Sequence, residues 1–150
     1  MKLLKDIKDQ ESRVKFLKEE YMSNRSMLEV SGISYENIGA AIASHPTDKM
    51  AECIAAVIDY ENELKEEEAK LIAMRLTATA MMSKLPNEHE REVLRRWYLL
   101  HQKESQIEDE MRCSKSTIYA LRQRGLVHLE KIGKNWKNLE RKRLDMEDPT

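Results

Sequence analysis

The sequence is poor in cysteine, proline, glycine and aromatic residues, and these shortages exclude several classes of protein. Its 150 residues include 2 cysteines, 3 prolines and 4 glycines, and aromatic residues make up 5%. Cys53 and Cys113 have no paired spacing and the four histidines have no ligand spacing, so neither a disulfide framework nor a metal site is expected. With 35% charged residues, this composition favours long solvent-facing helices over sheet.

Long apolar runs and catalytic motifs are also missing. No apolar run approaches the ~20 residues that cross a bilayer, and the opening MKLLKDIKDQE lacks the apolar core of a signal peptide. No Gly-rich phosphate loop, nucleophile elbow or metal signature occurs, and the carboxylates at residues 66–68 fit an exposed helix face. The sequence therefore predicts a cytoplasmic protein that is not an enzyme and uses no cofactor.

The N-terminal half has the heptad spacing of two long helices. Over residues 3–31, one core position of the heptad is apolar throughout and comprises Ile7, Val14, Tyr21 and Leu28. The second core position alternates apolar residues with Gln10 and Asn24, which suits a partly exposed coiled coil whose register these two polar residues fix. Residues 31–48, SGISYENIGAAIASHPTD, break the period and predict a loop or short turns.

A second heptad register runs from Thr47 to residue 85 and predicts a helix of about 36 residues. Its core positions comprise Met50, Val57, Leu64, Leu71, Ala78 and Leu85, together with Cys53, Tyr60, Glu67, Met74 and Met81. Two such helices joined by one loop are expected to fold back antiparallel. Ile54, Ile58 and Ile72 exceed what one partner helix covers, which favours a homodimer or higher oligomer; the alternative is that residues 85–129 of the same chain cover them.

Leu85, Pro86 and Asn87 mark the start of a second part of the chain. Pro86 disfavours helix at Leu85, and Asn87 with Glu90 forms the pattern of a capping box for the next helix. The expected buried face of that helix comprises Val93, Leu94, Trp97 and Leu100.

Residues 105–129, SQIEDEMRCSKSTIYALRQRGLVHL, have the pattern of a helix-turn-helix. Ser105 is the expected cap of the first helix, Arg112 and Cys113 form the turn, and Ser114 is the expected cap of the second helix. The second helix has one apolar stripe at helical period: Ile118, Leu121, Gly125 and Leu129. Gly125 within this stripe predicts a close helix crossing.

The face opposite this stripe is the candidate DNA-binding surface. Lys115, Ser116 and Tyr119 are expected nearest the bases, and Gln123 can pair with an adenine edge. Arg112 and Lys103 flank the first helix and are expected to hold phosphates. The complete set of candidate DNA-binding residues is Lys103, Arg112, Lys115, Ser116, Thr117, Tyr119, Gln123 and Arg124.

The distribution of charge supports a polyanion-binding surface. Residues 111–143 contain ten Lys or Arg and two Glu, a charge of +8, in a chain whose net charge is −1. Such asymmetry in a nearly neutral protein indicates local contact with a polyanion such as DNA. The alternative is that these cations only solvate a surface helix.

The stretch from Leu85 to Leu129 resembles region four of bacterial sigma factors. LPNEHEREVLRRWYL is similar to the opening helix of that module, and Ser114, Ile118, Arg124, Leu126 and Leu129 fall on matching positions of its helix-turn-helix. Arg112 stands where the turn of that module usually has glycine. With the block TDKMAECIAAVIDYENEL, the chain also resembles a family of small phage and prophage proteins akin to ArpU-type late-transcription regulators.

Together these patterns predict an all-α protein with a long antiparallel helical hairpin, residues 1–85, for oligomerisation. A helix-turn-helix module, residues 86–143, and an acidic tail, residues 144–150, follow, and Trp136 is expected in a short last helix or beside a DNA backbone. The resemblance implies a sequence-specific transcription regulator that binds double-stranded DNA and contacts RNA polymerase. Two alternatives remain open: a DNA-packaging subunit similar to small terminases, and a coiled-coil adaptor between proteins.

Overall fold

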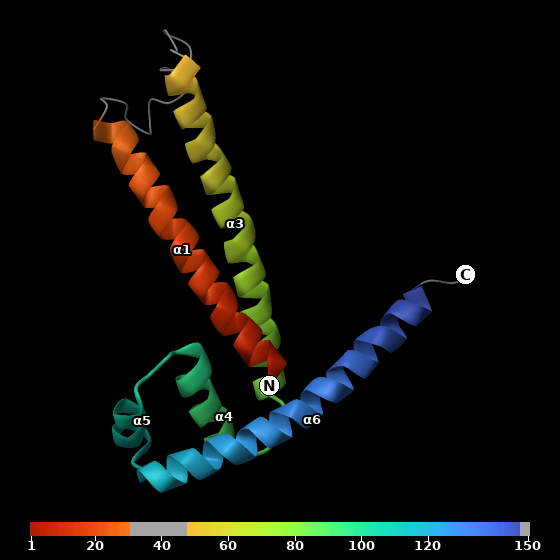
Figure 1. Cartoon of the computed structure of the whole chain (residues 1–150). Helices are drawn as coiled ribbons and strands as arrows, with labels where there is room; N and C mark the ends of the chain where they lie inside the picture. The colour runs from red at the N-terminus through yellow and green to blue at the C-terminus, as the bar shows by residue number, and fades with distance from the viewer. Residues whose placement is uncertain (31–47, 148–150) are drawn as a thin grey trace. The chain divides into compact units, whose positions relative to one another are not determined.

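The computed structural model describes residues 1–30 and 48–147, and these residues form helices without any strand. The elements are α1 (Lys2–Val30), α3 (Asp48–Met82), α4 (Glu88–Leu94), the π-helical segment η2 (Arg95–Leu99), α5 (Glu104–Met111) and α6 (Lys115–Glu147) (Figure 1). The predicted all-α class is confirmed. Apart from Asp48, the first residue of α3, the predicted loop at residues 31–48 lies outside the described residues. None of the described helices is long and apolar enough to span a membrane.

The chain divides into two compact units. One unit is Asp6–Ala73, and the other combines Met1–Lys5 with Met74–Thr150, so the division falls within α3. Compactness does not decide which parts of the chain fold independently, and the predicted domain boundary at residue 85 stays a prediction.

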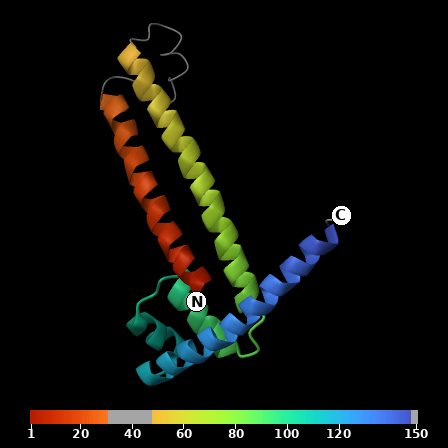
Figure 2. The same cartoon turned by 45° about the vertical axis from the view of Figure 1, so that its right-hand side comes forward.

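In the first unit, α1 and α3 lie side by side (Figure 1 and Figure 2) and share a hydrophobic core. Its buried residues are Leu17, Tyr21 and Leu28 of α1 and Ile54, Val57 and Leu64 of α3. The predicted α1 core position is largely confirmed, since Ile7, Tyr21 and Leu28 are buried and Val14 is half-buried.

A polar contact interrupts this apolar seam. The Gln10 side-chain amide donates to the Glu67 carbonyl oxygen at 3.0 Å and to the Glu67 carboxylate at 2.5 Å. This hydrogen bond from Gln10, followed by the one from Lys70, lowers the pKa of the Glu67 carboxyl. Asn24 instead donates to the carbonyl oxygen of Glu20 in its own helix at 2.8 Å. Of the two polar residues predicted to fix the register, Gln10 is therefore the one that joins the two helices.

The predicted register is wrong at the start of α3. Cys53, expected at a core position, is exposed, and Ile54, expected on the surface, is buried. A strict seven-residue repeat assumes 3.5 residues per turn, whereas a straight α-helix has 3.6, so the buried stripe drifts around the helix by about 20° per heptad. Ile58 and Ile72 remain exposed, as expected.

In the second unit, α4, η2 and α5 pack against the N-terminal half of α6 (Figure 1 and Figure 2). The core contains Val93 of α4, Ile107 of α5, and Ile118 and Leu121 of α6. Further along α6, Gly125 and Leu129 are also buried, which confirms the predicted stripe. A Cβ atom added at Gly125 would lie 3.1 Å from Leu94 Cδ1, so the predicted close crossing is confirmed as a crossing of α6 over α4.

The end of the α4 segment differs from the predicted buried face. Val93 and Leu94 are fully buried and Trp97 is half-buried, but Leu100 is 60% exposed and Leu99 is buried in its place. The prediction for Leu100 is wrong because residues 95–99 form a π-helical turn, in which the α-helical spacing between positions 93, 97 and 100 no longer holds.

Helix α6 is longer than predicted. It continues through Gly133 to Glu147, so Trp136 lies within it, and the prediction of a separate short last helix is wrong. Trp136 lies beneath the Lys84 ammonium, 4.4 Å from the ring centroid, and its Nε1 donates to Glu140 at 3.0 Å. Residues 144–147 of the predicted tail are helical, and residues 148–150 lie outside the described residues.

The two glycines of α6 are expected to respond oppositely to alanine substitution. At Gly133 a new Cβ would meet only the flexible ends of Met81 and Met1, at 3.0 and 3.1 Å. These methyl groups can move, so Gly133→Ala should raise the free energy of unfolding by about 0.5–1 kcal/mol through helix propensity. At Gly125 the new Cβ meets Leu94, which is fully buried and cannot retreat. Gly125→Ala should therefore lower the free energy of unfolding by about 1 kcal/mol.

Urea denaturation followed by circular dichroism measures both changes. Equal effects of the two substitutions would contradict the tight crossing at Gly125.

Candidate nucleic-acid interface

The position of α6 is set first by its contact with the start of α4. Asn87 caps α4, since its side-chain oxygen accepts from His89 N at 2.9 Å and from Glu90 N at 3.2 Å. Glu90 does not return the capping bond; its carboxylate is buried and lies 2.8 Å from His128 Nδ1 of α6. This pair joins α4 to α6 about one helical turn from Gly125. Glu90, which the sequence predicts as part of a capping box, instead makes a contact between the two helices.

Helix α5 begins two residues earlier than a cap at Ser105 predicts. Lys103 precedes it with extended backbone angles, φ −69° and ψ 149°, and its carbonyl oxygen accepts from Gln106 N and Ile107 N. Ser105 therefore lies inside the first turn and cannot cap the helix, and the prediction for Ser105 is wrong. The cap position is instead occupied by Lys103, whose side chain makes no capping bond.

A three-residue turn leads from α5 to α6. Arg112 ends α5 in the left-handed region, with φ 54° and ψ 42°, and the Cys113 amide donates to the carbonyl oxygen of Glu108 at 3.2 Å. The Cys113 side chain packs against the core of Val93, Ile107, Ile118 and Leu121. Ser114 then precedes α6, and its hydroxyl oxygen lies 3.4 Å from Thr117 N and 2.9 Å from the Thr117 hydroxyl. This is the capping geometry predicted for Ser114.

All eight candidate DNA-binding residues are exposed. Ser116, Tyr119 and Gln123 lie on the face of α6 opposite the buried stripe, and the Tyr119 ring is 59% exposed. Ala120 is exposed beside them, so small and hydrogen-bonding groups occupy the first turns of this face. Ser116 and Ala120 are small, so a base edge can approach this part of the face closely, and Tyr119 is the large side chain beside it. The Ser114 hydroxyl lies 2.9 Å from the Thr117 hydroxyl and 3.2 Å from the Ser116 hydroxyl, so Thr117 makes the closer of the two contacts with the cap.

The cations around this face are mostly free to meet phosphates. Lys115 lies 4.0 Å from Glu104, a solvent-exposed ion pair that contributes little and is readily exchanged. The side chains of Lys103 and Arg124 make no hydrogen bond or ion pair within the part of the chain that the structure describes. The first turns of α6 thus present positive charge at its N-terminus, which attracts anions by itself.

Arg122 belongs to the packing of the module, although it stands in the basic run. Its guanidinium lies over the Trp97 ring, 4.4 Å from the centroid, and its Nε donates to the Tyr98 hydroxyl at 3.0 Å. The sequence gives no sign of this contact, because the two aromatic residues are 24 and 25 positions away. Arg122 therefore joins α6 to η2 rather than contributing freely to the basic surface.

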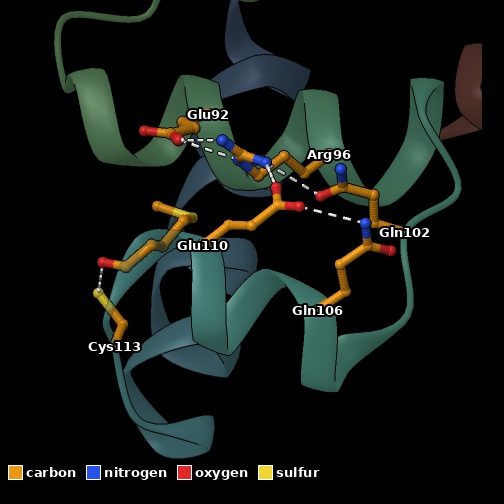
Figure 3. Close-up of polar contacts among 7 residues, drawn as sticks. Glu92, Arg96, Gln102, Gln106, Glu110 and Cys113 are labelled. Carbon is orange, nitrogen blue, oxygen red and sulfur yellow. Dashed lines mark hydrogen bonds and ion pairs between the residues drawn. The ribbon is translucent and has the colours of Figure 1, made fainter.

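A second arginine, Arg96, holds α5 in place. It bonds Glu92 at 2.9 Å, Gln102 at 3.1 Å and Glu110 of α5, as Figure 3 shows. The hydrogen bond that Arg96 donates to Glu92 is the main cause that raises the pKa of the Arg96 guanidinium. The spacing of Glu92 and Arg96 is a signal for this pair, but the link to Glu110 depends on the turn before α5.

In the described residues, no group of three or more His, Cys, Asp or Glu side chains lies together so that it could hold a metal ion. Cys53 and Cys113 are not joined in a disulfide.

One family model matches residues 43–130, more than half of the chain, and describes a protein of unknown function, DUF1492. The chain belongs to this family. The matched residues include α4, α5 and the first half of α6, so the family model covers the candidate interface as well as the whole of α3. No curated protein and no solved structure matches the chain.

The left-handed backbone at Arg112 predicts a stabilising substitution. Arg112→Gly should raise the free energy of unfolding by about 0.5–1 kcal/mol relative to Arg112→Ala, because a side chain is unfavourable in this region and glycine is not. Both variants lose the same charge, so the difference between them isolates the backbone effect. Thermal and urea unfolding measure it, and equal stability of the two variants would show that this turn is not left-handed in solution.

Proposed function

We propose that this protein is a sequence-specific DNA-binding transcription regulator of the phage or prophage type. In this proposal α5, the turn at Arg112 and α6 form a helix-turn-helix similar to sigma region four. The observation that carries it is the exposed face of α6 with Ser116, Tyr119 and Gln123, set opposite a stripe that is buried on α4 and α5. The cap at Ser114 supports it, because it leaves the first turn of α6 open to the major groove.

The proposal assigns different roles to the exposed residues. Ser116 and Gln123 read base edges, since a serine hydroxyl and a glutamine amide both pair with bases. Lys103 and Arg112 bind phosphates and so position the module without reading sequence. Lys115, Tyr119 and Arg124 lie beside the reading residues, while Thr117 supports the cap of the helix.

Self-association through an antiparallel hairpin of α1 and α3 is part of the same proposal. The unit Asp6–Ala73 exposes large apolar side chains, with Phe16 at 60%, Met27 at 68% and Ile72 at 58% exposure. A second copy would bury this surface and gain about 25 cal/mol for each Å² removed from water. A dimer also brings two reading helices to paired half-sites, which is how small helix-turn-helix proteins gain affinity.

The proposed role of Ser116 and Gln123 in reading bases is tested by measuring how each variant binds the selected site and how it binds scrambled duplex. Ser116→Ala and Gln123→Ala should each lose about 1–3 kcal/mol of binding free energy on the selected site and almost nothing on scrambled duplex. Lys103→Ala and Arg112→Ala should weaken both duplexes alike, because they lose phosphate contacts. The measurement is fluorescence anisotropy on a genome-selected site and its scrambled control at one salt concentration.

Two outcomes would count against the proposal. If the Ser116 and Gln123 variants keep full discrimination, α6 does not read bases, and a docking surface for a protein such as RNA polymerase becomes the better explanation. If the wild-type affinity for duplex does not fall as salt rises, phosphate binding itself is absent.

The oligomer is tested on the full chain. The double variant Ile58→Glu, Ile72→Glu places two charges on the exposed apolar side of α3 and should shift the protein towards monomer, because a buried unpaired charge disfavours an interface. Lys15→Glu with Lys18→Glu on α1 introduces the same number of carboxylates at exposed polar positions and should leave the mass unchanged. Light scattering measures the mass of each; an unaltered oligomer in the isoleucine variant would place the interface elsewhere.

A further inference from the structure

A groove lies along the outer side of α4, between that helix and the C-terminal part of α3, all within the second unit. Its cations are Arg75 of α3 and Arg91, Arg95 and Arg96 of α4 and η2. Leu99 and Leu100 contribute apolar surface to the same lining. We refer to these six residues as the arginine groove.

The arginine groove has more positive charge than its own carboxylates neutralise. Two glutamates line it, and Arg96 is already paired with Glu92 at 2.8 Å and with Glu110 outside the lining, so the excess positive charge comes from the other arginines. Arg91 donates one hydrogen bond to the main-chain carbonyl oxygen of Leu85, which leaves its charge without a carboxylate partner. In the described residues the side chain of Arg95 has no hydrogen bond or ion pair, and Glu88 is the remaining carboxylate of the lining. The groove is therefore left with an attraction for anions.

The apolar part of the groove indicates which kind of anionic ligand fits it. Leu100 is 60% exposed beside these arginines, because the π-helical turn removes it from the buried face. A nucleic-acid backbone gains nothing from an exposed leucine. A peptide that combines carboxylates with an apolar side chain would use both parts of the lining, the carboxylates through charge-assisted bonds to arginine and the side chain through burial of Leu100.

The groove also lies away from the candidate DNA-binding face. Glu90 and Leu94 of α4 point towards α6, as their contacts with His128 and Gly125 show. Arg91 and Arg95 each come one residue later, which turns them by about 100° around α4 and away from α6. The exposed face of α6 points away from α4 in turn. A duplex bound along that face leaves the arginine groove open.

We propose that the arginine groove is a docking site for a short acidic segment of a partner protein that also carries a leucine-like side chain. Charge complementarity provides the attraction, and Leu99 with Leu100 provides the contact for the apolar side chain. The site does not depend on DNA binding by α6. The proposal therefore goes beyond the function proposed above and is tested separately from it.

The test uses the full chain and a short fluorescein-labelled peptide of Asp, Glu and Leu, followed by fluorescence anisotropy. Arg95→Glu should weaken peptide binding roughly tenfold or more, the change produced when a surface charge contact is lost and replaced by a repulsion. Leu100→Ser should weaken it roughly threefold or more through lost apolar contact. Lys18→Glu, an equal charge change at an exposed position of α1 in the other unit, should leave it unchanged.

A second arm measures duplex DNA with the same variants. Unchanged duplex affinity in Arg95→Glu, together with weakened peptide binding, supports the docking site. A parallel loss of duplex affinity would overturn it by making the groove part of the DNA surface. The proposal is also overturned if wild type does not bind the peptide at about 1 mM, if Arg95→Glu binds it as well as wild type, or if a peptide with Ser in place of Leu binds equally well. The wild-type duplex affinity decides the proposed DNA binding independently of these outcomes.

Discussion

The arrangement of the C-terminal unit depends on how closely α6 crosses α4 at Gly125. A Cβ atom at this position would lie 3.1 Å from a fully buried Leu94, so the absence of a side chain allows the two helices to approach. One turn away, the buried Glu90 carboxylate meets His128, which adds a directional polar bond to the apolar contact. The crossing buries one side of α6 and so determines which side remains exposed. The candidate DNA-binding face is the direct consequence of this packing.

The turn before α6 shows a compromise between stability and charge. Arg112 occupies a left-handed conformation that disfavours any side chain other than the hydrogen of glycine. The hydrogen bond from Cys113 N to Glu108 O and the buried surroundings of Cys113 hold the turn in this shape. Arg96 adds a second restraint by joining η2 to Glu110 near the end of α5. The angle between α5 and α6 is thus maintained by contacts around Arg112, and this position keeps its positive charge beside the start of α6.

The apolar periodicity of the sequence predicted most of the helices and the buried stripe of α6, because burial repeats at helical spacing. It failed wherever the spacing itself changes. The π-helical turn exposes Leu100. In α3 the buried stripe of a helix with 3.6 residues per turn drifts relative to a seven-residue repeat, so Ile54 is buried where Cys53 was expected. Ser105 and the continuous α6 were missed because capping residues and glycines are weak local signals that tertiary packing overrides. The role of Arg122 could not be predicted, since stacking on Trp97 depends on a contact between distant residues.

Helix α4 connects the two surfaces to which we assign binding. Its Glu90 and Leu94 fix α6, and its Arg91 and Arg95 line the arginine groove on another side. Because Glu90 and Leu94 of this seven-residue helix contact α6 while Arg91 of the same helix lines the groove, a ligand in the groove and a duplex on α6 would be held at a fixed distance and angle. If a flexible linker joined the two sites, both ligands could bind at once, but their orientation relative to each other would not be fixed. On these two proposals, the tight crossing at Gly125 lets the module place a partner protein at a defined position on DNA, which is the requirement for a regulator that acts through another protein.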